Sequence, residues 1–263
     1  MNYFEKLAAR SRAANSLVCV GLDPDFKRHK VQDIAGYNRA IIDATAPYAA
    51  CYKPNIAFYE QYGIEGLRAL EATLAAIPGD IPVIGDVKRG DIGSTAAAYA
   101  RAMFDEWKFD AITLSPYLGH DSFEPYLAYE DRGFYIICRT SNPGAADLQY
   151  LPAGDGLRLY ERVALTVTQW SPMVGLVVGA TAPSELRRIR ELVPNASLLV
   201  PGVGAQGGEP AEVVAAAGAT PGTIVVSASR SIMYASDGKD FAEAAGDAAR
   251  LLRDQLAATP SPA

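Results

Sequence analysis

The stretch IPVIGDVKRGDIGST at 81–95 starts as a buried strand and ends in a cluster of charges. An isolated buried charge destabilises a protein by several kcal/mol, so charges at the end of such a strand need a partner or a function. Side chains alternate along a strand, which places Asp86 and Lys88 on one face and the apolar side chains on the other. We predict that the apolar face packs against helices and that both charges face an open end of the sheet.

Seven further strand-like runs occur along the chain, with helix-like segments between them. The eight runs are 16–23, 49–55, 81–88, 111–116, 133–142, 173–180, 197–204 and 223–230. The intervening segments 63–77 and 183–193 carry apolar residues three and four apart, as amphipathic helices do. Strict alternation of strands and helices implies a parallel sheet, and eight such units in about 250 residues is the size of a (β/α)8 barrel. We therefore predict an α/β fold, a single (β/α)8 TIM barrel domain over 1–263, with a disordered tail at about 257–263.

This fold also predicts where the chemistry lies, because active sites of such barrels occupy the C-terminal ends of the strands. Polar residues close or follow six of the eight predicted strands: Asp23, Lys53, Asn55, Asp86, Lys88, Thr140, Ser141, Gln206 and Arg230. A structural salt-bridge network is the alternative interpretation of Asp86 and Lys88. The presence of Asp23 and Lys53 at neighbouring strand ends favours an active site instead.

The loop PGVGAQGG at 201–208 follows the seventh predicted strand and contains Gly202, Gly204 and Gly207. This G-x-G-x-x-G spacing occurs in dinucleotide sites, but the acidic residue expected about twenty positions later is missing. Barrels commonly hold a phosphate at this place, with loop amides and a helix N-terminus. Arg230 adds a cation that can form two parallel hydrogen bonds to a phosphate. We interpret the loop and Arg230 as a phosphate site, with a purely structural glycine turn as the alternative.

Composition excludes several other classes of protein. With 49% hydrophobic and 21% charged residues, the chain has the balance of an ordinary globular protein. The net charge of −6 argues against a nucleic-acid surface, which needs a basic patch. No apolar stretch approaches the roughly twenty residues of a membrane span. The run LVCVGL near the N-terminus is too short for a signal-peptide core. We expect neither a nucleic acid nor a membrane as partner.

The cysteines and histidines show no catalytic or metal-binding spacing. Cys19, Cys51 and Cys138 each lie in a predicted strand, and an odd number in apolar settings favours reduced thiols and a cytoplasmic chain. His29 and His120 do not form an HxH or HExxH pattern, so we expect no metal site. The GxSxG pattern of a nucleophilic serine is also absent.

The charges at the strand ends suggest a type of reaction. A lysine flanked in space by two aspartates keeps its proton, because neighbouring anions stabilise the ammonium form. Lys88 is therefore suited to donate a proton. An aspartate beside it would repel a substrate carboxylate, and the repulsion disappears if that group leaves as carbon dioxide. The pattern favours decarboxylation followed by protonation of the carbanion. Since we find no thiamine, pyridoxal or metal motif, we expect no cofactor and a rate that depends on preorganised charge.

Five motifs together resemble one family. DVKRGDIGSTA, CYKPNIAFYE, TSNPGA, PGVGAQGG and SASR are similar to those of the orotidine 5′-phosphate decarboxylases, in their longer bacterial branch. The resemblance implies a homodimeric (β/α)8 enzyme that converts orotidine 5′-phosphate to UMP without a cofactor, in pyrimidine synthesis. It also implies that Lys53, Asp86, Lys88 and Asp91 form an alternating charge network. In this network Lys88 protonates C6, and Asp86 lies beside the departing carboxylate.

The resemblance further implies a set of substrate-binding residues: Asp23, Ile92, Thr95, Ser141, Gln206, Gly207, Gly208 and Arg230. Asp23 would hold the ribose hydroxyls together with Lys53. Ser141 and Gln206 would contact the pyrimidine and the lid, and Gly207, Gly208 and Arg230 the phosphate. Asp91, with Ile92 and Thr95, would reach the active site of the neighbouring subunit, so that the two sites of the dimer are shared.

Two alternatives share part of this pattern. A magnesium-dependent sugar-phosphate decarboxylase or aldolase of the same wider barrel group would resemble the chain at Asp86, Lys88 and Asp91. Such enzymes place a carboxylate at the end of the second strand, where this chain has Lys53. A non-catalytic nucleotide-phosphate binding barrel would keep the phosphate loop but would not need the alternating charges. The 145–170 segment carries no motif that we can assign.

Overall fold

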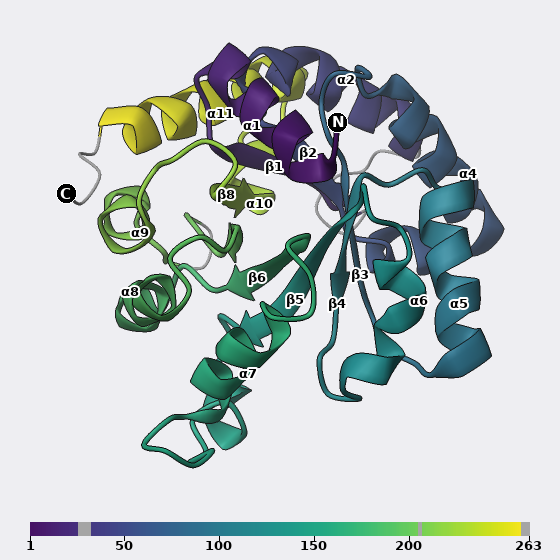
Figure 1. The fold of residues 1–263 in the computed structure, drawn as a ribbon. Coiled ribbons are helices and arrows are strands. Elements are labelled where there is room, and N and C mark those ends of the chain that lie inside the picture. Colours follow the sequence, from purple (N-terminus) through teal and green to yellow (C-terminus); the bar gives the residue numbers. More distant parts are fainter. Residues whose placement is uncertain (26–32, 205–206, 259–263) are drawn as a thin grey trace.

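Eight parallel strands form the centre of the part of the chain described by the computed structural model, residues 1–25, 33–204 and 207–258 (Figure 1). The strands are β1 Val18–Leu22, β2 Cys51–Pro54, β3 Ile84–Arg89, β4 Ala111–Leu114, β5 Gly133–Arg139, β6 Val174–Val178, β7 Leu198–Pro201 and β8 Ile224–Ala228. Each predicted run contains one of them, except that β3 extends one residue beyond the run 81–88, to Arg89. Their order is β2-β1-β8-β7-β6-β5-β4-β3, so every strand except β2 and β3 has two hydrogen-bonded neighbours in the sheet.

Two isolated bridges close this sheet into a barrel. Tyr52 pairs with Val83 near the start of β3, and Asn55 pairs with Asp86 farther along the same strand. They bring the two edge strands β2 and β3 together. The (β/α)8 TIM barrel predicted from the sequence is therefore confirmed.

Helices surround the barrel, as alternation along the chain requires (Figure 1). The longer ones are α2 Ile34–Thr45, α4 Gly63–Ala76, α5 Gly93–Arg101, α7 Leu159–Val167, α8 Pro183–Leu192, α9 Pro210–Ala217 and α11 Phe241–Ala258. The short ones are α3 Ala57–Glu60, α6 Glu124–Leu127 and α10 Arg230–Met233, with turns of other helix types at η1 Ala46–Tyr48, η2 Ala102–Glu106, η3 His120–Ser122 and η4 Pro143–Asp147. The segments predicted as helices over 63–77 and 183–193 are α4 and α8. In α8 the buried side chains Leu186 and Ile189 lie three positions apart, as the pattern indicated.

The first helix, α1 Tyr3–Ala14, packs against the N-terminal ends of β4 and β5. The backbone N–H of Tyr3 donates to Asp131 O at 2.9 Å. The Tyr3 ring packs edge-on against Tyr135, with 5.9 Å between the ring centroids. Lys6 pairs with Asp110, the residue before β4, at 2.9 Å. This end of the barrel is therefore covered by protein, which leaves the C-terminal ends of the strands for a site.

The three cysteines are free and buried, as the sequence predicted. Cys19 and Cys51 face each other in the β1–β2 register, and Cys138 lies in β5. Burial raises the pKa of the Cys138 thiol. None of the helices among the described residues is long and apolar enough to cross a membrane.

Two predicted features involve the residues outside the described ranges. Helix α11 continues through Ala257 and Ala258, the first two residues of the tail predicted from the sequence, and 259–263 lie outside the described residues. His29 lies outside them as well.

The segment between β5 and β6 departs from the barrel wall. Figure 1 shows α7 and the loop before it extending away from the other helices, at the lower left of the view. Tyr150 ties this loop back, because its hydroxyl accepts from Arg139 Nη2 at 2.8 Å and also hydrogen-bonds Glu185. The segment that carried no motif is thus attached to the strand end of β5.

Candidate active site

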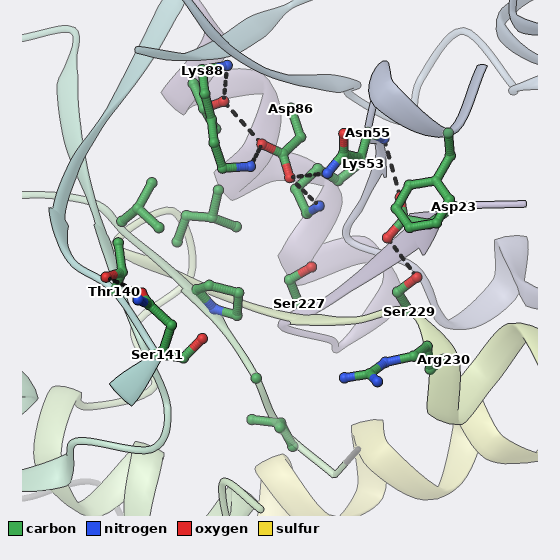
Figure 2. Close-up of a pocket in the computed structure, with 18 of the residues that line it drawn as sticks. Asp23, Lys53, Asn55, Asp86, Lys88, Thr140, Ser141, Ser227, Ser229 and Arg230 are labelled. Atoms are coloured by element: carbon green, nitrogen blue, oxygen red, sulfur yellow. Dashed lines mark hydrogen bonds and ion pairs between the residues drawn. The ribbon is translucent and has the colours of Figure 1, made fainter. Parts of the chain in front are cut away.

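A cavity of about 560 Å³ lies at the C-terminal end of the barrel, and every strand contributes to its wall. In chain order, one lining residue from or just after each strand is Asp23, Lys53, Asp86, Thr113, Ile137, Val177, Leu199 and Ser227. Figure 2 shows Lys53, Asp86 and Lys88 gathered on one side of this cavity, with Arg230 apart from them. The fold therefore brings the predicted charges into one site.

Asp86 is buried at the centre of the charged group, and both of its oxygens are hydrogen-bonded. Its Oδ2 accepts from Lys53 Nζ at 2.9 Å and from Asn55 Nδ2 at 3.4 Å. Its Oδ1 accepts from Lys88 Nζ and, at 3.1 Å, from the hydroxyl of Thr113. Three strands therefore fix this carboxylate in one orientation.

The electrostatics of the group keep it ionised. Burial alone would raise the pKa of Asp86, but the charges of Lys53 and Lys88 outweigh burial and hold that pKa well below its usual range. Burial would lower the pKa of Lys53, whereas Asp86 and Asp23 raise it above its ordinary value. Lys53 and Asp86 consequently form a permanent buried ion pair, while half of the Lys88 side chain (49%) remains exposed to the cavity.

The backbone of β3 changes at Lys88, which simple strand alternation does not predict. Lys88 has a φ of 45°, in the left-handed region that non-glycine residues rarely adopt. The register with β4 also shifts between Gly85 and Arg89. Asp86 and Lys88 do line the cavity together, as predicted, but the reason is an irregular strand end rather than a regular two-residue repeat.

Asp23 follows β1 and is held by neighbouring strands on both sides. Its Oδ1 accepts from Asn55 N at 3.1 Å, and its Oδ2 accepts from Ser229 Oγ at 2.7 Å. Its carbonyl accepts from the Tyr234 hydroxyl at 2.9 Å, and the same hydroxyl accepts from Asp25 N at 2.7 Å. Asp23 is therefore oriented before any ligand binds.

Thr140 and Ser141 line the opposite wall, beyond the end of β5 (Figure 2). Thr140 is held by Gln149, which lies in the segment that carried no motif. Gln149 Oε1 accepts from Thr140 N at 2.9 Å, and Gln149 Nε2 donates to Thr140 Oγ1 at 2.8 Å. This double contact fixes the backbone next to Ser141.

The residues predicted to bind phosphate are brought together only in part. Arg230 lines the cavity with Gly202 and is exposed. Across the described ranges, no carboxylate forms an ion pair with it. Gly207 N donates to Gly204 O at 2.9 Å and Gly208 N to Gly202 O at 3.1 Å, so both amides are engaged within the loop. Gln206 lies outside the described residues.

Asp91, Ile92 and Thr95 lie outside the cavity wall of their own chain. Ile92 is 58% exposed, and the Asp91 carboxylate accepts from the Ile92 amide at 2.8 Å. Thr95 is exposed in the first turn of α5. The structure therefore separates these three residues from the charged group that precedes them by only a few positions.

Comparison with known proteins identifies the family. The model of the orotidine 5′-phosphate decarboxylase / HUMPS family matches residues 16–245. The chain is also 50% identical over 252 residues to the orotidine 5′-phosphate decarboxylase of Herpetosiphon aurantiacus, covering 92% of this chain and 93% of that protein. The chain belongs to the orotidine 5′-phosphate decarboxylase family.

Solved structures of related proteins have the same fold. The structure of Leishmania donovani OMP decarboxylase superimposes with a TM-score of 0.83 at 38% identity, covering 97% of this chain and 99% of that one. The structure of Leishmania donovani UMP synthase superimposes with a TM-score of 0.86 at 40% identity and covers 98% of this chain. The chain spans 57% of the length of that UMP synthase.

The sequence did not single out three residues that line or support this cavity: Thr113, Gln149 and Tyr234. Thr113 is the polar residue within the apolar run AITL, and that contrast was a signal that could have been followed. Gln149 lies nine residues after Thr140, in the segment without a motif, and only the fold of that segment brings the two residues together. No spacing rule links Tyr234 to Asp23, which precedes it by 211 residues.

Proposed function

We propose that Lys53, Asp86 and Lys88 carry out the reaction of the family, in which orotidine 5′-phosphate is decarboxylated to UMP. The decarboxylation itself, a carboxy-lyase reaction of pyrimidine biosynthesis, follows from membership of the family. The roles of individual residues are our proposal. It is supported chiefly by one observation, the buried Asp86 carboxylate held between the two ammonium groups.

Asp86 supplies repulsion toward the reactant. A substrate carboxylate placed beside it meets a carboxylate that cannot turn away, because both of its oxygens are held by the protein. Cleavage of the bond between C6 and the carboxyl carbon removes one of the two negative groups as carbon dioxide. The electron pair of that bond remains on C6. Since this repulsion is relieved as the bond breaks, it favours the transition state over the bound reactant.

Lys88 completes the reaction. Its ammonium group stabilises the negative charge that develops on C6 and then transfers one proton to that carbon, which gives UMP. The neutral amine left behind recovers a proton from water, to which the half-exposed side chain has access. Because the fixed charges belong to the chain itself, we propose that the reaction needs no cofactor.

Lys53 makes the magnesium-dependent alternative less suitable for this site. Its Nζ lies 2.9 Å from Asp86, at the end of β2, where the rival enzymes would present a carboxylate to the metal. An ammonium group at that position repels a divalent cation. A non-catalytic barrel would have no need for a buried carboxylate between two ammonium groups, which is costly to desolvate.

We propose substrate contacts for the remaining cavity residues. Asp23 and Lys53 contact the ribose hydroxyls, and Ser141 contacts the pyrimidine together with Gln206. Arg230 binds the phosphate with the loop that contains Gly207 and Gly208. The exposed position of Arg230 in the cavity wall supports this assignment, since a guanidinium without a carboxylate partner can bind an anion without first breaking an ion pair.

We also propose a homodimer in which Asp91, Ile92 and Thr95 serve the active site of the other subunit. Two adjacent loops support the proposal. They lie side by side because Ser115 N donates to Arg89 O at 2.8 Å, which joins the loop after β4 to the loop after β3. These loops expose Ile92 (58%), Tyr117 (87%) and Leu118 (46%). Large exposed apolar side chains on neighbouring loops are typical of a protein interface.

Replacement of Lys88 by alanine tests the residue assignment. We expect Lys88→Ala to lower kcat for orotidine 5′-phosphate at least about 100-fold, the usual contribution of general acid catalysis, with binding of UMP retained. Lys108→Ala is a matched control, since Lys108 is exposed and also has a positive φ, of 57°. Loss of the pyrimidine absorbance measures turnover. A folded Lys88→Ala protein that keeps more than a tenth of the wild-type kcat would overturn the assignment.

A further inference from the structure

Three residues of β3 lie opposite a single residue of β4. Gly85 pairs with Ile112 and Arg89 pairs with Leu114. Between these two pairs, β3 contains residues 86–88, whereas β4 contains only Thr113. Such a bulge leaves backbone groups of the longer strand without a ladder partner, and buried N–H groups without a partner destabilise the fold.

The Thr113 side chain supplies the missing partner. Its hydroxyl oxygen accepts from the backbone N–H groups of Val87 and Lys88, each at 3.0 Å. The same hydroxyl donates its proton to Asp86 Oδ1 at 3.1 Å. A threonine hydroxyl has one donor and two acceptor sites, so all of its capacity is used within the charged strand end. Thr113 is 2% exposed, so its hydroxyl is largely shielded from solvent.

The conformation of Lys88 depends on this bulge. In a regular strand, successive N–H groups point in opposite directions, but here two successive N–H groups point to one oxygen. The φ of 45° at Lys88 is the backbone turn that allows it. A left-handed lysine is unfavourable and persists only where surrounding contacts enforce it. The hydrogen bond from Lys88 N to Thr113 is such a contact.

We propose that Thr113 is a positioning residue for the decarboxylation, which acts by fixing the Lys88 backbone and the Asp86 carboxylate in one geometry. Figure 2 shows the Lys88 side chain returning from the strand end to Asp86. The Thr113 hydroxyl contacts both residues, since it accepts from Lys88 N and donates to Asp86 Oδ1. The inference rests on the proposed roles of Lys88 and Asp86. Thr113 itself acts on the reaction only through these two residues.

Two substitutions separate the hydroxyl from the shape of the side chain. Thr113→Val keeps the volume and removes all three hydrogen bonds, and Thr113→Ser keeps the hydroxyl and removes a methyl group. We expect Thr113→Val to lower kcat roughly 10- to 100-fold, because a small misplacement of a catalytic group can cost that much, while KM changes less than about threefold. Thr113→Ser should recover kcat to within about threefold of the wild type.

Thr45→Val is the matched control. Thr45 is also fully buried and donates to Ile41 O at 2.7 Å, but it lies on α2 and does not line the cavity. Any general effect of a buried hydroxyl on stability should appear there as a lower Tm without a change in kcat. If Thr113→Val does not fold, Thr113→Ala replaces it, because the smaller side chain also lacks the hydroxyl and avoids any steric clash.

The outcomes distinguish this inference from the proposed function. A folded Thr113→Val or Thr113→Ala protein with kcat within threefold of the wild type, beside an inactive Lys88→Ala protein, overturns the positioning role alone. The same result follows if Thr113→Ser is no more active than Thr113→Val. If Lys88→Ala is itself active, the residue assignment of the proposed function fails first. Unchanged affinity of Thr113→Val for UMP, measured by titration, supports an effect on the chemical step.

Discussion

Strands β1 to β4 and strands β5 to β8 build opposite sides of the cavity in different ways. On the charged side, Asp23 and Asp86 each accept hydrogen bonds from neighbouring strands, and Asp86 is buried between two lysines. On the other side, which we call the phosphate side, Arg230 is exposed, and the described residues place no carboxylate against it. Figure 2 shows the two sides separated by the cavity.

In our proposal, the difference follows from what each side has to do. Groups that act on the reacting bond are most effective when they are oriented before the substrate arrives, since no reorganisation is then needed during the reaction. A group that binds the phosphate can wait for its ligand, and its binding energy can then help to hold a loop closed. The first task favours buried ion pairs, and the second favours an exposed cation.

The largest expected effect tests whether the charged side of each active site needs residues from both subunits. In our proposal Asp91 serves the partner, so Lys88→Ala and Asp91→Ala proteins that are inactive alone should complement each other after subunit exchange. Random exchange gives about half heterodimers, each with one intact site of two, and activity should recover to about a quarter of the wild type. Mass spectrometry confirms the subunit exchange, and turnover of orotidine 5′-phosphate by the exchanged mixture measures the recovered activity.

A second mixture serves as the control for this experiment. Lys88→Ala and Asp86→Ala change two residues that line the same cavity of one chain. Every site of their heterodimer would carry one of the two defects, and no recovery is expected. If exchange occurs and the Lys88 and Asp91 variants also fail to recover, Asp91 acts within its own subunit and the shared site is excluded.

An intermediate effect is expected on the phosphate side. Arg230→Ala removes a charge-assisted interaction, so kcat/KM for orotidine 5′-phosphate should fall roughly 10- to 150-fold. The nucleoside orotidine has no phosphate, and its much slower turnover should change less than about threefold. Arg187→Ala on the exposed face of α8 is the control. Equal losses with both substrates would show that Arg230 does not act through the phosphate.

The smallest effect is expected from the segment beyond β5. Gln149→Ala removes two hydrogen bonds to Thr140, and both residues are partly exposed. Uncharged hydrogen bonds contribute about 0.5–1.5 kcal/mol each, and only part of that loss reaches the substrate because Gln149 lies outside the cavity wall. We therefore expect less than about a tenfold rise in KM and little change in kcat. Steady-state kinetics beside the exposed-residue control Gln169→Ala would check it. A loss in kcat equal to that of Lys88→Ala would mean that the two sides are not independent.

Much of this molecule was predictable from its sequence for a local reason. Apolar runs of strand length and helical spacing between them depend only on residues close together in the chain, so the eight strands and helices α4 and α8 could be located. In a parallel barrel all strand ends meet at one rim, which is why Asp23, Lys53 and Asp86 could be expected in one cavity.

The tertiary structure alone decided how those residues are held. The bulge in β3 arises from its register with β4, and Thr113 can satisfy it only because the two strands are neighbours. Gln149 reaches Thr140 because the loop after β5 folds back, and Tyr234 reaches Asp23 because β8 adjoins β1. Contacts of this kind join residues whose distance in space is set by strand order and register, and no local pattern of side chains encodes either.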